Sequence, residues 1–209
     1  MSTAGGGVGL GARVVIGTVC GFAWAGALRM YMAAINGVIS TVDWTGTFVG
    51  VLLPGALIGA GLGLTTGLDG ARHAALLRVI AASPLLFGII PMLRPGALSV
   101  FLRAGTGGGA VGVALAALAG GFALGGGRRK ALRIFCGVLA LATAVSVAVT
   151  VPTIGQLALT TPRGAFTALF AASLVAVLCF GCAIPFRKLA SVRTGAQPRQ
   201  TSDSSPGAH

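Results

Sequence analysis

The fold class that the sequence predicts is an all-α integral membrane protein, a bundle of six transmembrane helices with Gly-rich helix packing. Hydrophobic residues make up 55% of the 209 residues, and charged residues only 9%. A soluble domain carries roughly 25% charged residues, so this chain could hardly cover a water-facing surface. Long apolar runs alternate with short basic gaps, and 35 glycines are available for close contacts between helices.

The net charge of +12 raises a second possibility, which is binding to nucleic acid. Nucleic-acid binders gather their basic residues on one soluble face or on a flexible arm. Most Arg and Lys residues here instead separate apolar runs, as in membrane topology. We therefore expect a lipid bilayer as the partner, and no nucleic acid. The excess of Arg over Lys, with abundant Ala, Gly and Val, is typical of a GC-rich bacterial gene and predicts a bacterial plasma membrane protein.

The first predicted element is a helix over residues 14–35, after a Gly-rich segment, residues 1–12, that we expect to be disordered. The apolar run has 22 residues, enough to cross a hydrocarbon core of ~30 Å at about 1.5 Å per residue. Its start also resembles a secretory signal, because Arg13 precedes an apolar core and small residues near Ala25. A signal core is usually shorter, and this run continues past Arg29, so we expect an uncleaved helix.

The remaining elements are five further apolar runs, each separated from the next by a polar or basic gap. They are expected at about residues 44–64, 75–93, 104–126, 134–152 and 165–186. The six spans define a transmembrane domain over residues 13–188. The tail over residues 189–209 is basic and then rich in Ser, Pro and Gln, which predicts disorder.

The distribution of positive charge predicts the orientation. Six spans place both termini on one side, and that side holds eleven Arg and Lys residues against four on the other. Cytoplasmic loops carry the excess of positive charge, so we expect both termini to be cytoplasmic. The eleven are Arg13, Arg72, Arg78, Arg128, Arg129, Lys130, Arg133, Arg187, Lys188, Arg193 and Arg199. The four are Arg29, Arg94, Arg103 and Arg163.

Small residues recur at four-residue spacing in three spans, which places them in a stripe along one helix face. Such stripes let helix backbones approach closely in a bilayer. We interpret them as seams within the bundle, although the same pattern also serves a homo-oligomer or a membrane partner. The stripes are Gly17, Gly21 and Ala25; Gly55, Gly59 and Gly63; and Gly108, Gly112, Ala116 and Gly120.

Two prolines, Pro54 and Pro84, fall inside predicted spans. Proline removes a backbone donor and tends to kink a helix. Such kinks are common in membrane helices, where neighbouring groups satisfy the freed backbone. They also mark hinges and broken-helix binding sites in some transporters.

The candidate polar site is formed by Arg29, Asp43 and Asn36. Arg29 interrupts the first apolar run and continues the stripe of small residues, eight positions after Gly21. Asp43 is the acid assigned to the outer side, and it could pair with Arg29 if the chain reverses at the turn dipeptide Asn36-Gly37. An ionisable residue within a span is a functional candidate. The alternative is an arginine that snorkels to the outer headgroups.

No catalytic, metal or cofactor constellation emerges from the pattern. Cys179 and Cys182 form a CxxC that could be a redox pair, but it is also consistent with small apolar packing residues. His73 lies alone beside a basic residue, and nothing pairs a nucleophile with a base. The sequence thus disfavours an enzyme and predicts no cofactor. Two functions stay open: a small transporter or channel-like bundle, and an accessory or assembly subunit that packs against a membrane partner.

Overall fold

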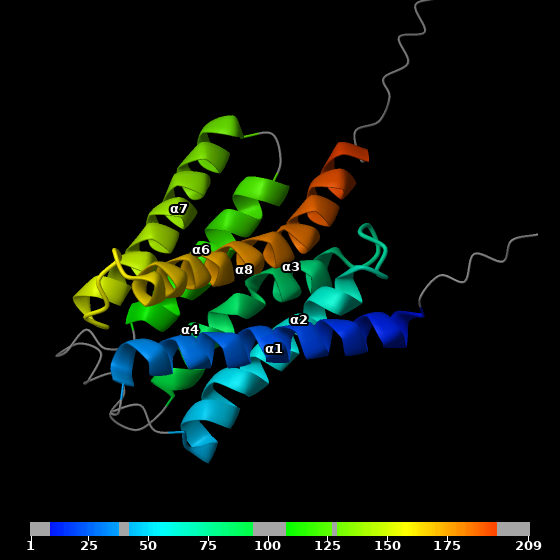
Figure 1. Cartoon of the computed structure of the whole chain (residues 1–209). Coiled ribbons are helices and arrows are strands. Elements are labelled where there is room, and N and C mark those ends of the chain that lie inside the picture. The colour runs from blue at the N-terminus through cyan, green and yellow to red at the C-terminus, as the bar shows by residue number, and fades with distance from the viewer. Residues whose placement is uncertain (1–8, 38–41, 94–107, 127–128, 196–209) are drawn as a thin grey trace, which may run out of the picture.

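The computed structural model describes residues 9–37, 42–93, 108–126 and 129–195, and within them the secondary structure is entirely helical (Figure 1). The helices form six stretches, one for each predicted range, so the all-helical prediction is confirmed. In chain order the stretches are α1 (Leu10–Asn36); η2 (Trp44–Leu52) with α2 (Leu53–Thr65); α3 (Ala74–Ala82) with η3 (Ser83–Leu85) and α4 (Leu86–Met92); α6 (Gly108–Gly125); α7 (Lys130–Thr153); and α8 (Pro162–Gly195). Of these, η2 is a π-helix and η3 a 3₁₀-helix.

Four of these helices are long and apolar enough to cross a membrane. They are α1, the joined η2–α2, α7, and α8 over Pro162–Val192, whereas Ala74–Ile90 and Val111–Gly125 are apolar but shorter. The outer faces of the bundle also carry large apolar side chains, such as Val15, Met30 and Phe135. Exposed apolar surface on this scale indicates a membrane-embedded protein.

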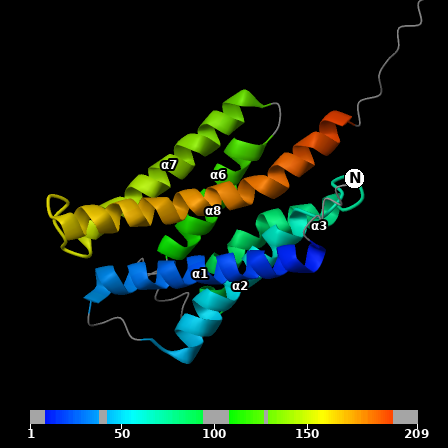
Figure 2. The same cartoon turned by 45° about the vertical axis from the view of Figure 1, so that its right-hand side comes forward.

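Contacts between distant segments place the start of α1, the end of α2 and the end of α8 together. Arg13 Nη1 and Lys188 Nζ both donate to the Thr66 carbonyl oxygen, at 3.1 and 3.2 Å. We call this the basic end, and in Figure 2 α1 and α8 both run from this side of the bundle to the opposite side. At the far end, Tyr31 of α1 donates to the Val147 carbonyl oxygen of α7, at 2.9 Å.

Among the described residues, the most extensive helix contact is the seam between α1 and α2, which cross in both views (Figures 1 and 2). A Cβ at Gly21 would overlap the Gly55 carbonyl oxygen, and one at Gly59 would overlap that of Gly17. Only glycine therefore allows the two backbones to meet here. The interpretation of the first two stripes as seams within the bundle is confirmed.

The third stripe, on α6, divides into two parts. Ala116 is fully buried, and a Cβ at Gly120 would overlap the Cys179 side chain of α8. At Gly112, in contrast, an added Cβ would meet nothing within 4 Å. Gly121, which lies off the predicted stripe, also packs against α8. The seam thus follows only the second half of the stripe.

Proline interrupts the third stretch, as its position predicts. Pro84 has no N–H to donate to Ile80, and the Ser83 N–H bonds the Ile80 carbonyl oxygen instead. The chain therefore passes through one 3₁₀ turn before α4 begins. Pro54 lies where the π-helix η2 passes into α2, so the helix changes its hydrogen-bonding pattern at this proline and continues.

The helix boundaries differ from the predicted ones mainly in α8. This helix continues to Gly195, so residues 189–195, which the sequence placed in the tail, are helical. Residues such as Lys188 and Leu189 favour a helix once a preceding turn has nucleated it. The predictions for residues 1–8 and 196–209, and for Arg94 and Arg103, lie outside the described residues.

Candidate functional site

Arg29 lies half-buried on α1 and reaches across to the next helix. Its Nε donates to the Thr47 hydroxyl on η2, at 3.2 Å. Thr47 is only 5% exposed, and its N–H bonds the Asp43 carbonyl oxygen at 3.0 Å. The guanidinium therefore meets the first turn of η2, so the chain does reverse between Arg29 and Asp43. Thr47 lies one turn beyond Asp43, the acid that the sequence predicts as the partner of Arg29.

Asp43 is exposed and acts as the N-cap of η2. Its Oδ2 accepts hydrogen bonds from the Gly46 N–H at 2.8 Å and the Thr45 hydroxyl at 3.1 Å. A carboxylate is stabilised at this position by the unsatisfied N–H groups and the helix dipole. The ion pair between Arg29 and Asp43 stays a prediction, with the arginine placed against a side chain one turn from the acid.

Asn36 ends α1 in the turn that the sequence predicts. Its Nδ2 donates to the Met32 carbonyl oxygen at 3.0 Å, within its own helix. The next residue, Gly37, has φ of 57° and donates its N–H to Ala33. This left-handed C-cap is one that glycine adopts at little cost. The contacts described for Asn36 are those of a helix end, while Arg29 supplies the contact between helices.

Two aromatic residues that are not among the candidates predicted from the sequence, Trp24 and Tyr31, hold α1 to the other helices. The Tyr31 hydroxyl bonds the Val147 carbonyl oxygen and the Thr150 hydroxyl of α7. The Trp24 indole N–H donates to the Leu174 carbonyl oxygen of α8 at 2.9 Å. Buried Tyr and Trp usually find such partners, and this rule was the available signal.

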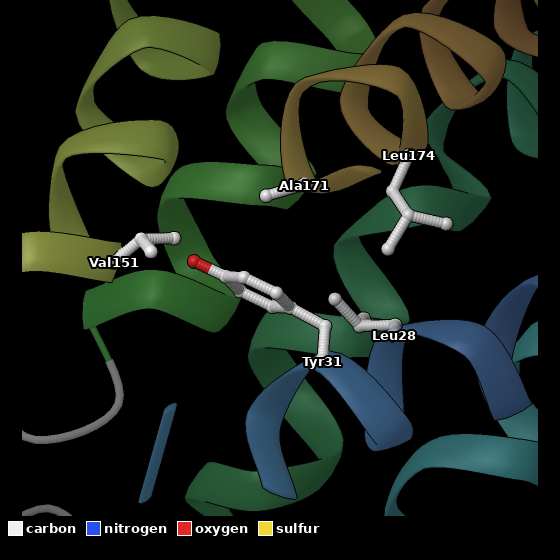
Figure 3. Packing of buried hydrophobic residues seen from close by; sticks show 5 residues of the cluster. All are labelled: Leu28, Tyr31, Val151, Ala171 and Leu174. Carbon is white, nitrogen blue, oxygen red and sulfur yellow. The ribbon is translucent and has the colours of Figure 1, made fainter. Parts of the chain in front are cut away.

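The Tyr31 ring belongs to an apolar cluster that joins three helices at the far end (Figure 3). Figure 3 shows the ring directed from α1 toward Val151 of α7, with Leu28 and Leu174 beside it. The cluster and the polar bonds of Tyr31 therefore fix α1 against α7 and α8 at one height of the bundle.

Between this cluster and the basic end, α1, α2, α4 and α8 enclose a partly open cavity of about 510 Å³. Its walls are apolar side chains and glycine backbone, and include Cys20, Trp24, Ile58, Phe87, Val177 and Ile184. The Trp24 and Phe87 rings lie 5.3 Å apart between centroids. Glycines of the α1–α2 seam form the floor, and they have no side chains to fill the space between α1 and α8.

The rim of this cavity at the basic end is polar. Arg13 and Thr66 both line it. Lys188 lies one helical turn beyond the lining residue Ile184, on the same face of α8, and shares the Thr66 carbonyl oxygen with Arg13. The cavity is therefore an apolar slot with two cations at one end.

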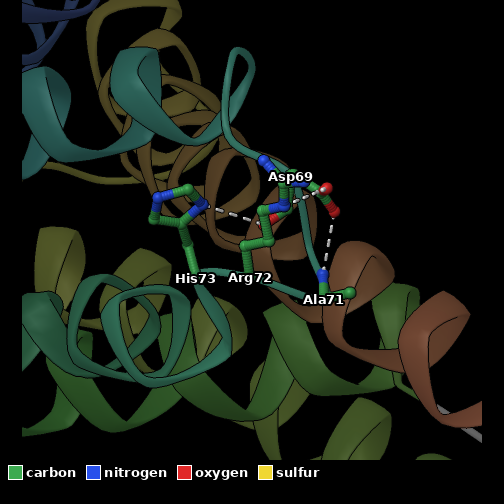
Figure 4. A network of polar contacts seen from close by, with 4 residues as sticks. All are labelled: Asp69, Ala71, Arg72 and His73. Atoms are coloured by element: carbon green, nitrogen blue, oxygen red, sulfur yellow. Dashed lines mark hydrogen bonds and ion pairs between the residues drawn. The ribbon is translucent and has the colours of Figure 1, made fainter.

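The loop between α2 and α3 has its own polar network at the basic end (Figure 4). Asp69 Oδ1 accepts from the Ala71 N–H at 3.0 Å, and Oδ2 lies 4.0 Å from Arg72 Nε. The Asp69 carbonyl oxygen lies 3.2 Å from His73 Nδ1. Both charged side chains are well exposed, so their ion pair stabilises the fold little. The network orders a turn and encloses no buried site.

Cys179 and Cys182 are both buried against α6. The Cys179 thiol donates to the Ala116 carbonyl oxygen at 3.3 Å, and Cys182 packs on Gly121. This placement supports the interpretation of the pair as packing residues. Within the described segments, no group of three or more His, Cys, Asp or Glu residues could hold a metal ion.

No family model matches the chain, and neither the curated proteins nor the solved structures give a match. The function is therefore inferred from the geometry of the cavity and of its rim.

Proposed function

We propose that this chain is a small, non-enzymatic, multi-pass transporter of a bacterial plasma membrane, and that it takes an amphiphilic molecule into the cavity between α1, α2 and α8. The observation that supports this proposal is the cavity itself, with its volume of about 510 Å³, apolar walls and basic rim. Ligand pockets commonly measure about 300–1,000 Å³ and combine apolar walls with a few placed polar groups.

The character of the walls selects the kind of solute. An ion or a sugar would lose its hydration in this slot and find few polar groups to replace it. A channel would need polar groups along a continuous path. An apolar chain loses nothing by entering, and a polar head could remain at Arg13 and Thr66 on the rim. Of the functions open to the sequence, the cavity favours a transporter of amphiphiles.

The proposed orientation has all six stretches crossing the membrane, with the basic end in the cytoplasm. Described cations gather there in excess, and positively charged segments stay on the cytoplasmic side. They are Arg13, Arg72, Arg78, Arg129, Lys130, Arg133, Arg187 and Lys188. A reporter fused after Lys188 should read cytoplasmic, and one in the gap over residues 153–164 should read external. The reverse pattern would refute this orientation.

Translocation of a fluorescent lysophospholipid between the leaflets of proteoliposomes tests the function. We expect the protein to accelerate this movement. Cys20→Phe should abolish the acceleration, because Cys20 is exposed toward the cavity and a phenyl ring there fills the slot without entering the α1–α2 seam. Val138→Phe, on the exposed face of α7, is the control and should keep full activity. Movement at the rate of empty vesicles would refute the transporter.

The second candidate function is an accessory subunit, and the surface of α7 favours it. Its exposed side chains include large apolar ones, Ile134, Phe135, Val138 and Leu141 among them. Lipid or a partner helix could cover this face equally well, because lipid tails are as apolar as Leu. A pull-down in mild detergent separates the two functions. A stable stoichiometric partner favours the subunit, and lysophospholipid movement without a partner favours the transporter.

A further inference from the structure

The rim of the same cavity supports a narrower assignment of its occupant, which rests on the proposed function. We propose that the occupant of the cavity is an anionic phospholipid from the leaflet at the basic end. One acyl chain lies between α1 and α8, and the phosphate lies against Arg13 and Lys188.

Two positively charged side chains converge at the rim of the cavity. Arg13 Nη1 and Lys188 Nζ bond the same oxygen, that of Thr66, at 3.1 and 3.2 Å. Lys188 also donates to the Leu68 carbonyl oxygen at 2.9 Å. Two cations are thus held together around neutral carbonyl groups at the end of α2. A phosphate placed beside them receives charge-assisted hydrogen bonds from both side chains.

The electrostatic field around the rim also favours an anion. Among the described residues of the basic end, the acid is Asp69, which is exposed and bonds Ala71 and Arg72 in its own loop. Among the described side chains, the eight cations of this end therefore outweigh the acid. Basic clefts between membrane helices on the cytoplasmic side are typical sites for anionic headgroups.

The length of the slot also fits this occupant. Its α1 wall runs from Arg13 through Gly17 and Cys20 to Trp24. Eleven residues of helix extend roughly 16 Å. This is about half of a ~30 Å hydrocarbon core, which is the depth of one leaflet. A headgroup held at Arg13 therefore places its acyl chain along the slot, with the chain ending near Trp24.

The slot is also accessible from the side. Ile16 of α1 and Val177 of α8 both line the cavity, and each is 57% exposed. The slot is open toward the bilayer between these two helices. A lipid already in the leaflet can enter by lateral diffusion, with its headgroup remaining at the membrane surface throughout.

Trp24 provides the test, because it lines the cavity and the chain contains only two tryptophans. Trp44→Phe leaves Trp24 as the sole indole. This protein is placed in phosphatidylcholine vesicles that contain a small fraction of brominated-chain lipid, either phosphatidylglycerol or phosphatidylcholine. We expect brominated phosphatidylglycerol to quench Trp24 at a lower mole fraction. Arg13→Gln and Lys188→Gln should each reduce this preference about fivefold, and the double variant should abolish it.

The control is Arg133→Gln, which removes a cation from the same end but away from the cavity, where Arg133 Nε bonds Ala123. It should keep the preference, as should Arg13→Lys, which conserves the charge. Loss with Arg133→Gln equal to that with Arg13→Gln would overturn the site in favour of general surface charge. Should Arg13→Gln fail to fold, Lys188→Gln alone carries the test.

The two proposals fail in different ways. Equal quenching by the two brominated lipids, removed in both cases by Cys20→Phe, would overturn the anionic headgroup and leave an apolar chain in the cavity. Quenching that Cys20→Phe does not change would show that no chain enters the slot, and this result would overturn the proposed function as well.

Discussion

The two sides of α1 pack in opposite ways. On the side of α2, glycine meets glycine, and an added Cβ at Gly21 would overlap the Gly55 backbone. On the side of α7 and α8, Trp24 and Tyr31 span the distance and end in hydrogen bonds to backbone carbonyl oxygens. The first contact leaves no free space, whereas the second leaves a cavity of about 510 Å³.

This difference shows how one helix can serve both stability and binding. Without a hydrophobic driving force between helices, close packing of small residues supplies much of the association in a bilayer. The seam therefore holds α1 in place, so the side of α1 that carries Trp24 and Tyr31 does not need to pack as closely. Trp24 lines the inner end of the cavity, and Tyr31 belongs to the apolar cluster beyond it.

The largest expected effect comes from breaking the seam. Gly21→Leu would force a side chain into the Gly55 carbonyl oxygen, which is backbone and cannot turn away. Overpacking typically costs about 1–3 kcal/mol and more where nothing can shift, so we expect a loss of about 3 kcal/mol or greater. Unfolding in a mixed-micelle titration with SDS measures it.

The matched control for this substitution is Gly26→Leu on the same helix, where an added Cβ meets nothing within 4 Å. It carries the same change in helix propensity and should be neutral or slightly stabilising. Equal losses at the two positions would mean that α1 and α2 do not meet through glycine.

A smaller effect is expected on the aromatic side. Tyr31→Phe removes the bond to the Val147 carbonyl oxygen and keeps the ring in its apolar cluster. The Thr150 hydroxyl also donates to that carbonyl oxygen, so no acceptor is left unsatisfied. We expect a loss of about 1 kcal/mol in the same titration, in line with polar contacts between membrane helices. A loss as large as that of Gly21→Leu would place the stability of α1 on this side instead.

The seam was predictable from sequence, and the cavity was not. Four-residue spacing of Gly17, Gly21, Gly55 and Gly59 determines which faces can meet, because a helix repeats every 3.6 residues. The spacing is a local property, so the apolar runs and their glycines were enough. The α6 stripe shows the limit of this pattern, because an added Cβ at Gly112 would meet nothing within 4 Å. Spacing identifies a helix face but not the helix that packs against it.

The cavity depends on contacts between α8 and helices of the first half of the chain. Lys188 meets Thr66 across 122 positions, and Trp24 meets Leu174 across 150. No local pattern encodes either contact. The polar candidates were chosen for their unusual place in apolar runs, and this criterion drew attention to Arg29, whose Nε bonds Thr47. It did not identify Thr47, whose buried hydroxyl accepts the bond, because a threonine in an apolar run is unremarkable by itself.

The smallest expected effect concerns Arg29, at the far end of the same seam. Its Nε bonds Thr47 at 3.2 Å, close to the first turn of η2 that Asp43 caps. We expect a double-mutant cycle of Arg29→Ala and Thr47→Val to give a coupling of about 0.6 kcal/mol, the average for polar contacts between membrane helices. A cycle with Asp43→Ala tests the predicted ion pair in the same titration.

The two cycles separate the interpretations of Arg29. Coupling to both residues would support an arginine that joins α1 to the capped start of η2 and extends the seam with a polar contact. Coupling to Thr47 with additive losses for Asp43 would remove the ion pair and leave the hydrogen bond. Additivity in both cycles would mean that the guanidinium is stabilised by outer headgroups, as in snorkelling. The seam would then depend on glycine alone, and the polar site would have no role in holding α1 beside the cavity.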